Sequence, residues 1–492
     1  MNLPRDPLRH PGHVRLFANS VFVALGQGSV ALLFVVYILA ARILGNAGFG
    51  DFSLGTTIAL VLLALPAWGT VRYASILAAR DPERTEDILS PSVGLTAVLA
   101  LVYLPLVWVT ATLVRDSDVV TRVAVLIGVD LLAREYGNLM RYLMRVHGAF
   151  ALDTVSVFAE RGLMVAGAAF VLLVEPDPVL LAAAFAAGRT LGVSITGALY
   201  RARVGPIGMR VDPPSLRRLF SGGTPIAIRR GLADISFRID MLFLGALRPS
   251  TELGWYGSIY QLMDGVVMLP SLVTESLSPT LSANFAEGRL DVVQRLYERG
   301  AKYLLLGGLF LSAVFAVLAE PIVQLLFGAA YAPAADALRL LSPAVLFIFL
   351  RRQATSVLDN VDLRSSTVWA FAGGVATNIV LNSLLVPSYG YLGAATATSV
   401  SEALLMGSMI WILSQAGYKP VAVTLIRAAL LSIGLATLVM WTLVGVPVLA
   451  FLAAAAVYLV SLTALRVWDE KDMLLLRDLR RRRAGGDRGA AQ

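Results

Sequence analysis

The sequence lacks cysteine altogether, and it is poor in charged residues and in histidine. Only 15% of its 492 residues are charged, against roughly a quarter in soluble globular proteins. The absence of cysteine excludes disulfides and thiolate metal sites. The three histidines, His10, His13 and His147, are too scattered to predict a metal site. No Walker A motif is present, so we expect no ATP hydrolysis by this chain. We also expect no metal and no other cofactor.

Apolar residues are abundant instead. They make up 57% of the chain, and the mean hydropathy is +0.73. This composition excludes a soluble enzyme, a nucleic-acid-binding module and a disordered protein. The apolar residues occur in runs of about 20, which as helices cross a bilayer core of ~30 Å. The sequence therefore predicts an all-α polytopic membrane protein.

Fourteen candidate transmembrane helices are bounded by charges, proline or glycine. Arg351 and Arg352 interrupt the tenth, and a tight hairpin at 445–447 joins the last two. The spans are 16–41, 52–78, 92–114, 119–143, 151–174, 178–200, 219–246, 254–284, 302–325, 333–357, 365–386, 391–414, 423–443 and 446–467.

The basic residues of the loops predict the orientation. The net charge of +8 reflects 41 basic and 33 acidic residues, and an excess of arginine in cytoplasmic loops accounts for it without nucleic acid. One side holds most of the loop arginines, among them Arg80, Arg84, Arg210, Arg217 and Arg218. The other side holds only Arg42, Arg115, Arg122 and Arg248. We therefore expect a cell-membrane protein with both termini in the cytoplasm, and a first helix that is retained because no cleavage signal follows it.

An internal repeat relates the two halves of the chain. A shift of 204 positions places Gly50-Asp51-Phe52 on Gly254-Trp255-Tyr256. This period spans an even number of helices, so the copies are parallel, as in transporters whose substrate path lies between two halves. The alternative to a true repeat is a chance match between apolar segments. The predicted parts are lobes at 1–200 and 219–414, a cytoplasmic linker at 201–218, two added helices at 415–467 and a basic tail at 468–492.

Charged side chains recur inside the predicted spans, where each costs roughly 2.5–3.5 kcal/mol on insertion scales and therefore faces the bundle interior. In the seventh span Arg230, Asp234 and Arg238 are spaced i, i+4, i+8, which places them on one helical face. The candidate substrate-binding residues are Arg72, Arg134, Arg189, Arg229, Arg230, Arg238 and Asn378. The candidates for ion coupling or for pairing are Asp234, Asp240 and Asp264.

Two interpretations of these charges remain open. Arginine suits phosphate, because its guanidinium donates paired hydrogen bonds and stays charged at any relevant pH. A cationic site for an anionic substrate is one interpretation, favoured in the seventh span by its surplus of arginine. Structural ion pairs are the other, and we expect them for Asp130 with Arg134 and for Glu160 with Arg161. Asp264 is either a proton or cation site or the partner of Arg229 or Arg238.

Several motifs resemble a known family. They are the turn at 44–53, Trp255-Tyr256, residues 277–282, Leu326-Phe327-Gly328 and, above all, Asn378 and Asn382 followed by residues 385–398. Together they resemble the polysaccharide transporter family, the Wzx-type O-antigen flippases of the multidrug/oligosaccharidyl-lipid/polysaccharide superfamily. The resemblance implies a MATE-like fold with two parallel six-helix lobes around a central cavity and two C-terminal helices.

The resemblance also implies a function. It is the translocation of a lipid-(pyro)phosphate-linked oligosaccharide from the cytoplasmic to the outer leaflet by alternating access, for surface polysaccharide such as lipopolysaccharide. The expected partners are this substrate, glycan polymerases or glycosyltransferases, and anionic inner-leaflet lipids, which the tail with Arg480 to Arg483 would contact. An ion-coupled multidrug exporter of the same superfamily is the alternative. A membrane-embedded glycan enzyme is disfavoured by the short outer loops.

Overall fold

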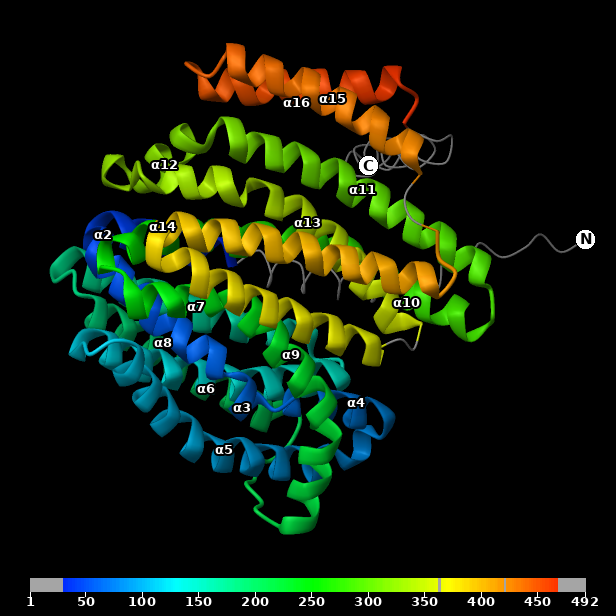
Figure 1. Ribbon diagram of the computed structural model, residues 1–492. Coiled ribbons are helices and arrows are strands. Elements are labelled where there is room, and N and C mark those ends of the chain that lie inside the picture. The colour runs from blue at the N-terminus through cyan, green and yellow to red at the C-terminus, as the bar shows by residue number, and fades with distance from the viewer. Residues whose placement is uncertain (1–29, 362–363, 420–421, 468–492) are drawn as a thin grey trace, which may run out of the picture. The chain divides into compact units, whose positions relative to one another are not determined.

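The computed structural model describes residues 30–361, 364–419 and 422–467, which form helices and no strand (Figure 1). The first half of this described chain contains α2 (Val30–Leu62), α3 (Ala64–Ala67), α4 (Thr70–Arg80), η2 (Pro82–Arg84), α5 (Thr85–Val114), α6 (Asp118–Val146), α7 (Phe150–Val174), α8 (Pro178–Arg203) and α9 (Pro213–Leu247). The second half contains α10 (Ser250–Ala286), α11 (Leu290–Val317), α12 (Ala319–Phe327), η3 (Ala329–Tyr331), α13 (Ala334–Asn360), α14 (Arg364–Gln415), α15 (Val423–Thr442) and α16 (Pro447–Ala464).

The described chain divides into two compact units. The first takes in the described residues up to Gly265 together with 324–337 and 367–401. In it α6, α7 and α8 pack side by side, α2 lies against α6, and α9 contacts both α2 and α5. The second takes in 266–323, the described part of 338–366, and the described residues from Glu402 onward. In it α15 and α16 pack together as a hairpin, and Tyr458 Oη donates to Leu306 O of α11 at 3.0 Å.

Two predicted pairs of spans each form one long helical run with a glycine break. Gly45 interrupts α2 with φ +69°, and Gly390 interrupts α14 with φ +55°. Both values lie in the region that residues with a Cβ rarely adopt. Within the described residues, eight segments are long and apolar enough to cross a membrane, and two of them, Ala31–Arg80 and Ser366–Gln415, are 50 residues long. At about 1.5 Å per residue each of these two is long enough to cross twice.

The predicted ninth span differs from the structure. Residues 302–325 were expected to form one helix, but α11 ends at Val317 and the short α12 begins at Ala319. Pro321 explains the break, because its ring has no N–H and clashes with the carbonyl four residues earlier. In addition, α11 begins at Leu290, between the predicted spans 254–284 and 302–325. The helix therefore extends beyond the predicted span at its start.

The predicted tenth span is not interrupted by its two arginines. They lie inside the continuous α13 because each has a partner in the same compact unit. Arg351 Nε donates to Glu402 Oε2 at 2.7 Å, and Arg352 donates to Ser271 Oγ at 2.9 Å. The tight hairpin expected at 445–447 is confirmed, since α15 ends at Thr442 and α16 begins at Pro447.

Half of the segment predicted as the linker is helical. α8 continues to Arg203 and α9 begins at Pro213, which leaves 204–212 as the connection. Asp212 caps α9 by accepting a hydrogen bond from Ser215 N at 3.1 Å, and Pro213 occupies the first turn, where its missing N–H has no cost. The connection is attached to α5, because Arg210 N donates to Ser90 O at 3.0 Å. The division into lobes stays a prediction, and the basic tail lies outside the described residues.

Candidate functional site

The charged face of α9 is the centre of the candidate site. Arg230 Nε lies 3.6 Å from Asp234 Oδ2, which confirms that these side chains share a helical face. Their side chains remain 48% and 38% exposed although they lie in the middle of a long helix. One turn further on, Arg238 Nη2 donates to both carboxylate oxygens of Asp264 on α10, at 3.1 Å each. Of the two partners that the sequence left open for Asp264, the structure selects Arg238.

Arg134 of α6 extends this charged face. It lies within electrostatic range of both Arg230 and Asp234, and its Nε is 3.5 Å from Glu135 Oε1. Its side chain is 28% exposed, whereas Glu135 is buried. We call Arg134, Arg230, Asp234, Arg238 and Asp264 the charged row. It brings three of the predicted substrate-binding arginines together with two of the predicted carboxylates.

Close contacts hold α9 on either side of the charged row. Toward the start of α9, a Cβ on Gly223 would overlap the carbonyl oxygen of Trp68, and the Trp68 ring stacks on Phe220 with centroids 4.4 Å apart. Toward its end, a Cβ on Gly245 would lie 2.5 Å from Leu54 Cδ1 of α2. Helix α9 is therefore tightly packed at both ends, while its middle carries accessible charges.

Asp240 lies two residues beyond Arg238 but in a different environment. It is only 1% exposed and accepts hydrogen bonds from Tyr256 Oη and Thr398 Oγ1, each at 2.7 Å, and from Tyr260 Oη. Its Oδ1 accepts from the backbone N–H of Met241 at 2.8 Å. Asp240 is thus bound by neutral donors and not by an arginine, unlike Asp234 and Asp264.

Comparisons with known proteins identify the family. The family model described as "Polysaccharide biosynthesis protein" matches residues 16–285, more than half of the chain. The chain belongs to this family. A second model, MatE, matches residues 225–384. Both place the chain in the multidrug/oligosaccharidyl-lipid/polysaccharide flippase superfamily, as the motifs in its sequence predict.

Individual relatives support this assignment. Stage V sporulation protein B of Bacillus subtilis is 22% identical over 419 residues, which cover 77% of this chain and 79% of that protein. The probable flippase AglR of Haloferax volcanii is 28% identical over 236 residues, about half of either chain (45% and 48%). The solved structure of lipid II flippase MurJ in an inward closed conformation superposes with a TM-score of 0.74 at 12% identity, covering 93% of this chain and 99% of that one. The predicted MATE-like fold is thereby confirmed.

In this member of the family a second group of charges is buried between α6, α7 and α8. Arg189 donates to Asp130 Oδ1 at 2.6 Å and to Glu160 Oε1 at 2.5 Å. Arg141 donates to the other oxygen of Glu160 and, at 2.8 Å, to Asn138 Oδ1. We call Asp130, Glu160, Arg189 and Arg141 the buried network. Two carboxylates meet two arginines here, so the charges balance.

The expected ion pairs within this region were wrong in their partners. Asp130 pairs with Arg189 of α8 instead of Arg134, and Glu160 pairs with Arg189 and Arg141 instead of Arg161. Adjacent residues point about 100° apart on a helix, and Glu160 reaches Arg141 of α6 and Arg189 of α8. Arg189 was predicted to bind substrate, but the structure places it among carboxylates with 8% of its surface exposed.

The remaining predicted residues lie on three different helices. Arg72 is exposed on α4, and Arg229 is half-buried beside Arg230 on α9. Asn378 is buried in α14, where it accepts a hydrogen bond from Asn382 Nδ2 at 2.7 Å. Among the described residues no three His, Cys, Asp or Glu side chains gather in a way that would hold a metal ion.

Sequence reasoning missed two groups that bind Asp240. Tyr256 and Thr398 belong to motifs that resemble the family, but neither was assigned to a site, because each lies in an apolar segment where one hydroxyl is unremarkable. A signal was present: Tyr256 and Tyr260 are four residues apart, which places both hydroxyls on the same face of a helix. Two tyrosines so spaced in a membrane helix need a buried acceptor, and Asp240 supplies it.

Proposed function

We propose that the protein is a flippase that moves a lipid-linked oligosaccharide, carried on phosphate or pyrophosphate, from the cytoplasmic to the outer leaflet of the cell membrane. Transport, not catalysis, is the activity assigned to it. The family and the flippase names of its relatives support transport of a lipid-linked substrate. The charged row carries the proposal for an anionic head group.

The geometry of the charged row favours an exchange of partners. Arg230 and Asp234 are 3.6 Å apart, too far for a strong hydrogen bond, and both are accessible. Such an ion pair is worth about 0–1 kcal/mol. A pyrophosphate offers a guanidinium shorter, charge-assisted hydrogen bonds, so it would displace Asp234. Arg238 is already oriented by Asp264, and Arg134 supplies a third cation from α6.

The carboxylates divide into two roles in this proposal. Asp234 and Asp264 pair with arginines and hold them in place between transport cycles. Asp240 faces three hydroxyl groups and no arginine, so it is the candidate for ion coupling. Asp240→Asn should remove the response of transport to an imposed proton or sodium gradient. The control is Asp118→Asn, whose side chain is exposed, and an unchanged gradient response in Asp240→Asn would reject the assignment.

An ion-coupled multidrug exporter of the same superfamily is the second candidate. The MatE model, which matches residues 225–384, favours it, because this range includes the carboxylates Asp234, Asp240 and Asp264. An exporter of cationic drugs would use these carboxylates for its substrate. The arginines of the charged row argue against that use, since they repel a cation.

Deletion of the gene in its host distinguishes the two candidates. The flippase proposal predicts that lipid-linked oligosaccharide accumulates on the cytoplasmic leaflet and that the wild-type gene restores its appearance outside. Arg230→Ala and Arg238→Ala should express stably but fail to restore it. Arg122→Ala, which alters an exposed ion pair, is the control. Normal glycan topology together with increased sensitivity to cationic drugs would instead favour the exporter.

A further inference from the structure

A pocket of about 220 Å³ lies within the first unit, away from the charged row. Two parts of the chain that are distant in sequence build it: the continuous stretch from the end of α4 through η2 into α5, and the first turns of α9. Its lining residues are Leu77, Arg80, Asp81, Arg84, Asp87, Ile88 and Arg218. Arg218 precedes Arg230 by 12 residues on α9, which is ~18 Å along the helix axis. The pocket is therefore separate from the charged row.

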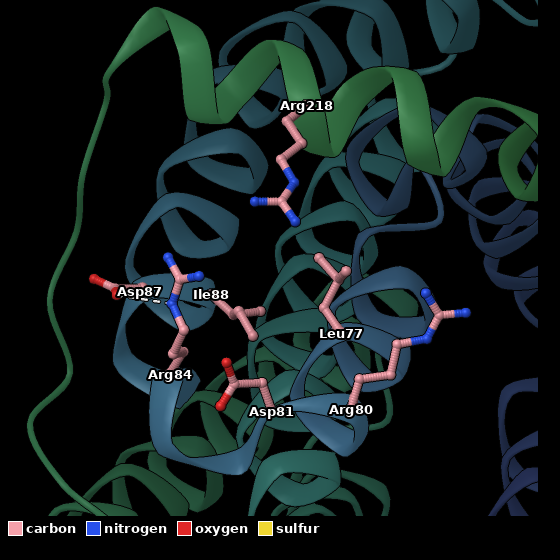
Figure 2. A pocket seen from close by; sticks show the side chains of 7 residues that line it. All are labelled: Leu77, Arg80, Asp81, Arg84, Asp87, Ile88 and Arg218. Carbon is pink, nitrogen blue, oxygen red and sulfur yellow. Dashed lines mark ion pairs between the residues drawn. The ribbon is translucent and has the colours of Figure 1, made fainter.

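Three guanidinium groups surround this pocket. Figure 2 shows Arg218 reaching down from α9, with Arg84 and Arg80 on opposite sides and Leu77 and Ile88 between them. Arg80 and Arg218 form no ion pair with any residue that the structure describes. All three arginines are exposed at the pocket. In Figure 2 the Arg218 guanidinium lies between the other two, with that of Arg84 next to Asp87 and that of Arg80 on the far side of Leu77.

The two aspartates of the pocket do not neutralise it. Asp87 is engaged by Arg84 at 3.6 Å and, from outside the pocket, by Arg210 at 3.8 Å. That leaves Asp81 as the second carboxylate of the lining. With Arg210 included, four arginines face two aspartates, so the pocket carries a positive surplus. Such a surplus attracts an anion.

The walls of the pocket are held in place by the fold. Ile88 packs against the buried cluster that contains Ala74, Ala78 and Leu89. The connection before α9 is attached to α5 through Arg210 N and Ser90 O, and the cap at Asp212 positions the first turn of α9. The arginines therefore project from a preformed frame, which lowers the ordering cost of binding.

We propose that this pocket binds the phosphate group of a phosphate ester. Arginine is the side chain best suited to it, since its planar guanidinium donates two parallel hydrogen bonds to phosphate oxygens. The apolar floor of Leu77 and Ile88 accommodates the carbon skeleton of the ester. A bound phosphate would bridge the α4–α5 turn to α9 and so stabilise the arrangement in which these segments meet. The sources of this chemistry are a phospholipid head group and a soluble phosphate ester.

Binding to the full-length purified protein tests the site without relying on transport. In one arm, glycerol 3-phosphate and inorganic phosphate are titrated calorimetrically into the protein in neutral detergent. In the other, native mass spectrometry counts phosphatidylglycerol retained from nanodiscs, with phosphatidylcholine nanodiscs as the reference. Binding in the first arm identifies a soluble ester as a ligand, and retention of one phosphatidylglycerol in the second identifies a lipid head group.

Matched variants locate the binding. The double variant Arg80→Gln/Arg218→Gln should weaken binding at least tenfold, because it removes both guanidinium groups that lack an ion-pair partner among the described residues. Arg217→Gln, next to Arg218 but outside the pocket lining, should bind as the wild type does. Asp81→Asn should strengthen binding several-fold by removing a negative charge, a gain that misfolding cannot produce. The proposal is overturned if the wild type binds neither ligand, if Arg217→Gln weakens binding as much as the double variant, or if Asp81→Asn does not strengthen it.

Discussion

Gly50 and Gly254, the two glycines that the internal repeat superposes, lie against one another in the structure. A Cβ on Gly50 would be 2.8 Å from Gly254 N and would overlap Ser250 O. A Cβ on Gly254 would overlap Asn46 O in turn. Repeat-related positions on α2 and α10 thus permit a backbone approach that no larger residue allows.

Gly254→Ala should therefore destabilise the protein although alanine favours helices by about 1 kcal/mol over glycine. The expected loss is about 1–3 kcal/mol, the range for overpacked positions, seen as a lower thermal midpoint in detergent. Gly265→Ala on the same helix is the control, because its Cβ would meet only Phe34 Cε2 at 3.8 Å. Equal midpoints for the two variants would show that the contact is not tight.

The neighbouring hydrogen bond from Ser250 Oγ to Asp51 Oδ1, at 2.6 Å, permits a cross-linking test. The chain has no cysteine, so Asp51→Cys/Ser250→Cys introduces the only thiols. We expect this pair to cross-link under mild oxidation and the cross-linked protein to stop transporting until it is reduced. The single variants serve as controls. Full transport by the cross-linked protein would mean that these helices do not separate during the cycle.

Removal of Arg189 should be costly, since Asp130 and Glu160 would remain buried without their shared cation. Arg189→Ala is expected to lower the free energy of unfolding by about 3–5 kcal/mol. Arg122→Ala, which disrupts an exposed pair with Asp118, should cost about 0–1 kcal/mol. Adding Asp130→Asn to Arg189→Ala should restore part of the loss. If Asp130→Asn restores none of the lost stability, charge balance is not what stabilises the buried network.

The cap at the start of α9 gives a prediction on pH. Hydrogen bonds from Ser215 hold the pKa of Asp212 below its ordinary value. A depressed pKa stabilises the folded state above the unfolded pKa of about 3.9, and this contribution is lost as the pH falls through the folded value. The protection of the Ser215 amide, which compares its exchange rate with the intrinsic rate at the same pH, should therefore fall on acidification in the wild type. In Asp212→Ala the protection should be low throughout, and equal protection profiles would contradict the role of the cap.

The sequence predicts the charges of α9 well and their partners poorly. Spacing of i, i+4 and i+8 determines which residues share a helical face, so Arg230 and Asp234 were placed together correctly. Spacing contains no information on which neighbouring helix faces them. Hence Arg229 and Arg238 both remained possible partners of Asp264, and Tyr256 and Thr398 were not connected with Asp240.

The partners in the buried network were predicted wrongly because spacing along one helix does not identify the helix that faces it. The fold was predicted correctly because it depends on a local property. Asp130 and Glu160 were paired with arginines near in sequence, but their actual partner Arg189 is 59 and 29 residues away, on α8. The helices themselves follow from apolar length, which is a local property. The breaks in α2 and α14, at Gly45 and Gly390, fall between consecutive predicted spans.

The central claim is that the charged row binds the phosphate of a transported lipid-linked saccharide. Translocation of a pyrophosphate-linked oligosaccharide into proteoliposomes containing the purified protein tests it most directly. We predict transport by the wild type and by Arg122→Gln, and at least a tenfold lower rate for Arg230→Gln/Arg238→Gln at equal reconstitution and thermal stability. Transport by the double variant at the wild-type rate would contradict the claim.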